Sequence, residues 1–175
     1  MLSKNLVGKL NDQINLEFFS SNLYLQMAAW CESQGLRGSA FFLGKHAGEE
    51  MMHMRKIFDY VNETGNLAVL GTIEAPPVAY GSLGNLFTRV LEHERQVTGK
   101  INALVDVAFQ EKDFATFNFL QWFVSEQHEE ETLVGEIVGM VKLVGGEGQG
   151  LYLLDREIAS IAARPPSGNP ADAAG

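Results

Sequence analysis

Four glutamates occupy positions where apolar core side chains are expected. When the sequence is read at steps of three and four residues, as on one face of a helix, each of four long segments shows an apolar stripe that a glutamate interrupts near its middle. A buried carboxylate without a partner is strongly destabilising, and no lysine or arginine occupies the same stripes. The pattern therefore predicts a bound metal among Glu17, Glu50, Glu94 and Glu130.

The ligand types restrict which metal is expected. Glu50 and His53 are three residues apart, which places a carboxylate and an imidazole on the same face of a helix. Alone, this Glu-x-x-His motif is most often a surface glutamate beside a hydrogen-bonded histidine. The three other inward glutamates favour a metal site instead, and oxygen ligands with one imidazole suit iron, manganese or zinc.

The predicted centre is dinuclear and asymmetric. Carboxylates from the middles of four packed helices lie at one level, which suits two metals with a bridging carboxylate. A symmetric pattern would contain a second Glu-x-x-His, but Gln127 stands three residues before Glu130. We expect one metal to bind Glu17, Glu50 and His53, and the other to bind Glu50 as a bridge, Glu94, Glu130 and, weakly or indirectly, Gln127.

The acids around this centre have two interpretations. Glu126, Glu129 and Glu130 follow one another at helical spacing, and Glu49 directly precedes Glu50. A dense acidic run of this kind is typical of a solvated helix face. The competing interpretation is a third metal position next to the pair.

Aromatic and histidine side chains flank the same positions. Tyr24 lies two turns after the inward glutamate of its segment, so its hydroxyl either reaches a ligand carboxylate and its ring donates an electron, or it is a plain core tyrosine. His46 lies one turn before Glu50 and either contacts a ligand or fills the core. His93 and His128 fall outside the stripes and are expected to face solvent.

The segments that carry these residues are predicted to be helices. They contain no proline, and glycines such as Gly35, Gly65 and Gly145 end them. The longer helices would each reach roughly 45 Å, and short connections would pair them as two antiparallel hairpins. The predicted helices span residues 5–33, 39–64, 82–110, 113–144 and 150–162.

Residues 66–82 are predicted to form a long crossover loop. Gly71, Pro76, Pro77 and Gly81 disfavour a helix there. At up to roughly 3.3 Å per residue, the loop can reach from one end of the bundle to the other, so that the second and third helices run parallel. The predicted fold class is all-α: a four-helix bundle with one long crossover and a short fifth helix.

Composition excludes several classes of protein. The length of 175 residues fits one domain, predicted over 1–162, before a proline-bearing tail at 163–175 that is expected to be disordered. Cys31, the single cysteine, cannot form an internal disulfide, which favours the reducing cytoplasm. A net charge of -9 disfavours nucleic acid as a partner, and we expect no signal peptide and no membrane span.

Two stretches resemble a known family closely. Residues 46–54, His-Ala-Gly-Glu-Glu-Met-Met-His-Met, resemble the second helix of bacterial non-haem ferritins, and residues 118–131, with the run Ser-Glu-Gln-His-Glu-Glu-Glu, resemble their fourth. The resemblance covers residues 1 to about 162. It implies a cytoplasmic, ferritin-like chain that assembles into a shell of 24 subunits, oxidises ferrous iron with O2 or H2O2, and stores the ferric mineral inside.

The resemblance also implies roles for individual residues. Tyr24 matches a redox-active neighbour of the metals, and Met51 follows the bridging glutamate at the offset of the haem methionine of bacterioferritins, although haem is not expected here. The positions that match the di-iron ligands are Glu17, Glu50, His53, Glu94 and Glu130, with Gln127 nearby, and those that match a third iron site are Glu49, Glu126 and Glu129.

Two other functions compete with iron storage. The first is a soluble di-iron oxidase or peroxidase that uses the same centre and stores nothing. Rubrerythrin-like peroxidases carry an additional cysteine-rich module, which one cysteine cannot build. The second is a purely structural bundle, which would leave the inward glutamates without compensation.

Overall fold

The computed structural model describes residues 2–145 and 148–164 and contains five helices over these ranges. Each predicted helix is present, close to its predicted bounds. The start shifts most in the second and fifth helices, which begin at Arg37 and Gly148 rather than at residues 39 and 150. The helices are α1 (Lys4–Ser33), α2 (Arg37–Glu63), α3 (Leu83–Gln110), α4 (Phe114–Val144) and α5 (Gly148–Ala162).

The local sequence explains where the helices begin and turn. Ser3, Ser82 and Asp113 cap α1, α3 and α4, because each side chain accepts a hydrogen bond from a backbone N–H in the first turn. The α1–α2 turn contains Gly35 at φ 75°, a left-handed conformation that glycine adopts without steric cost. Lys112 takes the corresponding role at φ 57° in the α3–α4 turn.

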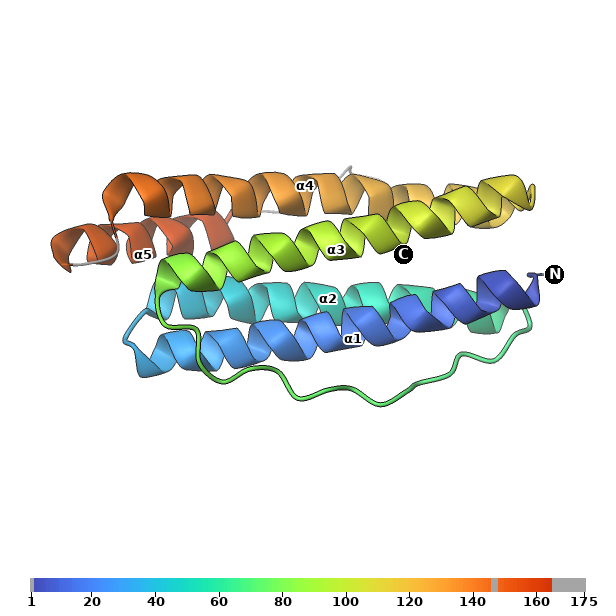
Figure 1. Ribbon diagram of the computed structural model, residues 1–175, viewed down its shortest axis with the longest axis horizontal. Helices are drawn as coiled ribbons and strands as arrows, with labels where there is room; N and C mark the ends of the chain where they lie inside the picture. Colours follow the sequence, from blue (N-terminus) through green and yellow to red (C-terminus); the bar gives the residue numbers. More distant parts are fainter. Residues whose placement is uncertain (1, 146–147, 165–175) are drawn as a thin grey trace.

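The helices form two antiparallel hairpins joined by a crossover. Figure 1 shows α1 beside α2, α3 beside α4, and the segment after α2 running back along α1 for the length of the bundle. As a result α2 and α3 run parallel, as was predicted from the length of the loop between them. The short α5 lies against one end of the bundle, where it packs on α2 and α4.

The apolar core is divided into two clusters. One contains Leu6, Leu10, Ile14 and their neighbours. The other begins at Leu23 and extends to α5. Glu17 lies between them in the sequence of α1, and the buried polar side chains of the other helices lie at the same level. The core therefore has a polar layer at mid-bundle, as expected for a centre that all four long helices build.

Candidate metal centre

The four glutamates predicted to face inward are all buried. Their relative exposures are 1% for Glu17, 2% for Glu50, 0% for Glu94 and 9% for Glu130. Each comes from a different long helix. Side chains of this type are rarely buried to this extent without a partner of opposite charge, so the layer needs protons or cations.

Glu17, Glu50 and His53 form the first donor group. One donor atom from each lies within 4.8 Å of the others, and all three side chains are buried. The Nδ1 atom of His53 is 3.3 Å from Oε2 of Glu50. The structure thus brings together the three residues predicted to bind the first metal.

Only one oxygen of the Glu17 carboxylate has a hydrogen-bond partner. Its Oε1 accepts a hydrogen bond of 2.8 Å from Nε2 of Gln13, whereas its Oε2 is buried without any hydrogen-bond partner. Burial and the negative charge of Glu50 raise the pKa of Glu17 well above its usual value. Burial and the charge of Glu94 do the same to the pKa of Glu50. An unpartnered oxygen among mutually repelling carboxylates fits a bound cation.

Glu94 lies across the layer from this group. The hydroxyl of Tyr24 donates to Oε1 of Glu94, and Nε2 of Gln127 donates to Oε2 at 3.0 Å. Burial and the charge of Glu130 raise the pKa of Glu94 to about 7. Tyr24 therefore reaches a predicted ligand carboxylate, as one of its two interpretations required.

Glu130 points toward His46. Its Oε2 lies 3.1 Å from Nε2 of His46. Although burial acts to raise it, the pKa of Glu130 is lowered, because the imidazole of His46 interacts with the carboxylate. Burial likewise acts to lower the pKa of His46, but the carboxylate prevails and raises it. In the described part of the chain the second convergent donor group is His46, Glu49 and Glu130; Glu94 belongs to neither group.

The residues of the predicted third position lie at the edge of the layer. Glu126 is half-buried, Glu129 is exposed, and Glu49 is half-buried with its Oε1 3.6 Å from Nζ of Lys45. In this conformation Glu49 groups with His46 rather than with the two α4 glutamates.

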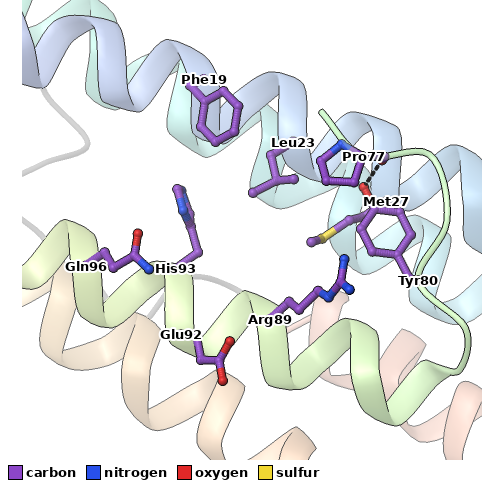
Figure 2. A pocket seen from close by; sticks show the side chains of 9 residues that line it. All are labelled: Phe19, Leu23, Met27, Pro77, Tyr80, Arg89, Glu92, His93 and Gln96. Carbon is purple, nitrogen blue, oxygen red and sulfur yellow. Dashed lines mark hydrogen bonds between the residues drawn. The ribbon is translucent and has the colours of Figure 1, made fainter. Parts of the chain in front are cut away.

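The prediction that His93 faces solvent is wrong. Only 8% of the residue is exposed, and its Nε2 lies 2.7 Å from Oγ of Ser20. Figure 2 shows His93 on α3 pointing toward α1, near Phe19, on the wall of a cavity between the two helices. Burial lowers the pKa of His93 to about 4. The error arose because α3 packs against both α1 and α4, so its buried face is wider than one stripe.

Two buried or half-buried residues beside the predicted metal ligands were not predicted. Gln13 is buried and holds Glu17, and its signal was the spacing of four residues between an amide and a carboxylate. The ring of Trp122 lies edge-on to His53 at a centroid distance of 5.3 Å. Met51 lies on an exposed stretch of α2, with 38% of its surface accessible. His128 is exposed, as predicted.

Comparisons with known proteins show what the chain is similar to. The model of the ferritin-like domain matches residues 7–144. The chain is 54% identical to the probable bacterial non-heme ferritin-like protein of Haemophilus influenzae over 94% of this chain and 99% of that one. It is 48% identical to a bacterial non-heme ferritin of Escherichia coli over 92% of this chain and 98% of the relative.

The chain belongs to the ferritin family. A solved open-pore ferritin from the archaeon Archaeoglobus fulgidus matches with a TM-score of 0.89 at 44% identity, over 91% of this chain and 98% of that one. The ferritin of Chlorobium tepidum matches with a TM-score of 0.82 at 45% identity, over 90% and 97% of the two chains. The all-α fold class, the resemblance to bacterial non-haem ferritins and the assignment to iron storage with ferroxidase activity are confirmed.

The domain bounds are still a prediction for this ferritin. The match to the family model ends at residue 144, before α5, whereas one domain was predicted over 1–162. Residues 165–175, which make up most of the predicted tail, lie outside the described residues. Among the described residues, no helix is both long enough and apolar enough to cross a membrane.

Proposed function

We propose that this ferritin oxidises Fe(II) within the polar layer of each chain and stores the ferric product inside a shell built from its own copies. The observation that carries the proposal is the buried set of glutamates, one from each long helix, with Oε2 of Glu17 left without a hydrogen-bond partner. Iron is the substrate of this centre, and two Fe(II) ions give up two electrons, which reduce O2 to H2O2 or H2O2 to water.

The proposed ligands fall into two groups, one on each side of the polar layer. The first iron binds Glu17, Glu50 and His53, which already converge. The second binds Glu94 and Glu130, with Glu50 as the bridge. For this second position the Glu130 side chain has to turn away from His46 and toward Glu94. Glu94 is already close enough to Glu50 for its charge to raise the pKa of Glu50.

Tyr24 and Gln127 hold the second side in place. Both donate hydrogen bonds to the carboxylate of Glu94, so they orient its oxygens before iron arrives. The ring of Tyr24 is buried within one hydrogen bond of a proposed iron ligand. Two Fe(II) ions supply two electrons. The position of Tyr24 suits a side chain that supplies a third electron when the oxidant requires it.

The storage part of the proposal requires assembly. We propose a homo-oligomer of 24 chains in the cytoplasm. Large apolar side chains remain exposed on the single chain, which supports burial against neighbouring copies. They include Leu25 at 60%, Phe41 at 55%, Phe109 at 60% and Phe114 at 63% exposure.

The deciding experiment measures how much iron stays with the protein. The purified assembly is loaded aerobically with excess ferrous salt and desalted, and iron per chain is measured. Retention many times larger than the number of ligand sites means a mineral inside a shell and supports storage. Retention of about two or three irons per chain is the capacity of a dinuclear site with one neighbour; it would contradict storage and favour a di-iron oxidase or peroxidase.

A further inference from the structure

We propose that the cavity between α1 and α3 binds a small phenolic carboxylate, a single aromatic ring with a hydroxyl at one end and a carboxylate at the other. The ring lies on the apolar floor of the cavity, the hydroxyl donates to His93, and the carboxylate pairs with Arg89. None of the proposed iron ligands is among the residues that line this cavity. The proposal therefore does not depend on the oxidation or storage of iron.

The cavity is large enough for one substituted aromatic ring. Its volume is about 190 Å³, and an apolar protein cavity of roughly 150 Å³ holds a benzene molecule. Its floor is made by buried side chains, among them Leu23 and Met27, whereas the rim carries the exposed side chains of Arg89 and Gln96. A ring can thus be buried on apolar atoms while a charged substituent reaches the surface.

One wall of the cavity is aromatic and held in place. The hydroxyl of Tyr80 donates to the backbone carbonyl of Pro77, as the dashed line in Figure 2 shows. The Tyr80 ring also packs edge-on against Trp30, with centroids 5.7 Å apart. Because its hydroxyl is already used, Tyr80 presents a fixed ring to the cavity. A bound aromatic ring can pack against such a wall in an edge-to-face or offset arrangement.

His93 supplies a hydrogen-bond acceptor at one end of the cavity. Its Nε2 lies 2.7 Å from Oγ of Ser20, and the hydroxyl of Ser20 donates its single hydrogen to the carbonyl of Leu16 at 3.0 Å. Nε2 must therefore donate to Ser20, which leaves Nδ1 of the neutral ring without a hydrogen. Among the described residues, Nδ1 makes no hydrogen bond. A buried acceptor of this kind needs a donor, and a phenolic O–H is one.

Arg89 supplies a positive charge at the other end. Arg89 and His93 are four residues apart on α3, a spacing that places their Cβ atoms roughly 5 to 6 Å apart on one face. Figure 2 shows both side chains pointing from α3 toward α1, whereas Glu92 points away. In the described part of the chain Arg89 makes no ion pair, and its guanidinium carbon lies 5.8 Å from the centroid of the Tyr80 ring. A guanidinium group at this position can bind a carboxylate through two hydrogen bonds.

The two polar ends restrict the class of ligand. A cation would be repelled by Arg89 and would find no carboxylate on the cavity floor. An aliphatic acid could pair with Arg89 but would leave the acceptor of His93 without a donor. A ring with a hydroxyl and a carboxylate at opposite ends satisfies both side chains and fills the apolar space between them.

Three related compounds test this chemistry on the full-length wild-type protein. Calorimetry would compare 4-hydroxybenzoate with 4-methoxybenzoate, which cannot donate a hydrogen bond, and with phenol, which carries no carboxylate. We expect saturable binding of 4-hydroxybenzoate, with 4-methoxybenzoate weaker by about tenfold or more, because it leaves a buried acceptor unpaired. Phenol should be weaker by about two- to fivefold, the usual effect of an exposed ion pair. Absence of saturable binding, or equal affinity for the two benzoates, would overturn the proposal.

Matched arginine variants test the carboxylate end. Arg89→Gln should weaken the binding of 4-hydroxybenzoate by about two- to fivefold and leave that of phenol unchanged. Arg95→Gln is the control on the same helix, because Arg95 is exposed and lies 3.7 Å from Glu131 instead of lining the cavity. It should change neither affinity. An equal loss in both variants would mean that the anion senses only the general surface charge, and this result would contradict the proposal.

A crystal structure locates the ligand directly. Crystals of the wild-type protein would be soaked in 4-hydroxybenzoate, and we expect its density in the cavity with the hydroxyl within hydrogen-bond distance of Nδ1 of His93. Density at other places only, with the cavity free of ligand, would overturn the proposal. Such a failure would leave the proposed iron chemistry untouched, because iron retention is measured without this compound.

Discussion

Asp155 on α5 binds the beginning of α2 through Gly38. Its Oδ2 accepts a hydrogen bond of 2.8 Å from the backbone N–H of Gly38, and its Oδ1 accepts one of 2.7 Å from the N–H of Ser39. Leu36, at the cap position of α2, makes no side-chain hydrogen bond to this helix. A carboxylate from another helix thus satisfies the free N–H groups and the positive end of α2, and it ties α5 to the bundle.

Gly38 is needed for this contact, so Gly38→Ala is expected to weaken the docking of α5. A Cβ at residue 38 would lie 1.9 Å from the backbone oxygen of Asp155, a clash that only movement of α5 relieves. Overpacking of this kind costs roughly 1 to 3 kcal/mol. We expect a lower Tm and faster proteolysis around residues 145–150. Gly44→Ala is the matched control, because a Cβ there meets nothing within 4 Å and alanine favours a helix. Equal Tm values for the two variants would contradict the argument.

The spacing of residues along one helix allowed the centre to be predicted. Contacts between residues far apart in the sequence could not be predicted in this way. Glu17, Glu50, Glu94 and Glu130 could be found because each interrupts an apolar stripe at steps of three or four. His93 was misplaced because its burial depends on α1, which the stripe of its own helix does not reveal. Asp155 gave no signal at all, since its partners lie more than a hundred residues away in the sequence.

Glu130→Ala is expected to slow the oxidation of Fe(II) while leaving the fold intact. The change removes one ligand of the proposed second iron, and even residues that only support metal ligands change activity about 10-fold or more. The initial rate of Fe(II) oxidation would be measured by stopped-flow absorbance after the protein is mixed with Fe(II) and O2. Glu136→Ala is the control on the same helix, because that side chain is exposed. Unchanged kinetics in the Glu130 variant would refute the site assignment.

Tyr24→Phe is expected to slow oxidation without changing how much metal binds. The variant keeps the buried ring but loses the hydroxyl that donates to Glu94, so only the hydrogen bond from Gln127 still orients that carboxylate. We expect a fall in rate of about 10-fold, with the zinc stoichiometry unchanged. Tyr60→Phe removes a hydroxyl that pairs with Thr116 instead and should leave the rate as it is. If both variants matched the wild type, Tyr24 would be only a core residue.

In the metal-free protein, the stability that protonated Glu94 contributes is expected to be lost as the pH rises from about 4.5 to about 7. Burial and the charge of Glu130 raise the pKa of Glu94 from its usual 4.5 to about 7, so in this window the folded chain holds a proton that the unfolded chain releases. The contribution is fully present below 4.5 and is lost by about pH 7. At about 1.4 kcal/mol per pKa unit, the contribution of Glu94 should fall by roughly 3 kcal/mol. His93, whose pKa burial lowers to about 4, acts in the opposite direction over the same range, because there the unfolded chain binds a proton that the folded chain does not.

Glu94→Gln isolates this effect, because the amide stays neutral and buried at every pH. In urea unfolding of the metal-free proteins, the stability of the wild type should therefore fall relative to that of the variant between pH 5 and 8. Bound Zn(II) should reduce the wild-type dependence as well, since a cation replaces the proton as the partner of the carboxylates. Glu17 and Glu50, whose pKa values are also raised by burial, act in the same direction. If the difference in stability between wild type and variant did not change from pH 5 to pH 8, Glu94 would be compensated in some other way.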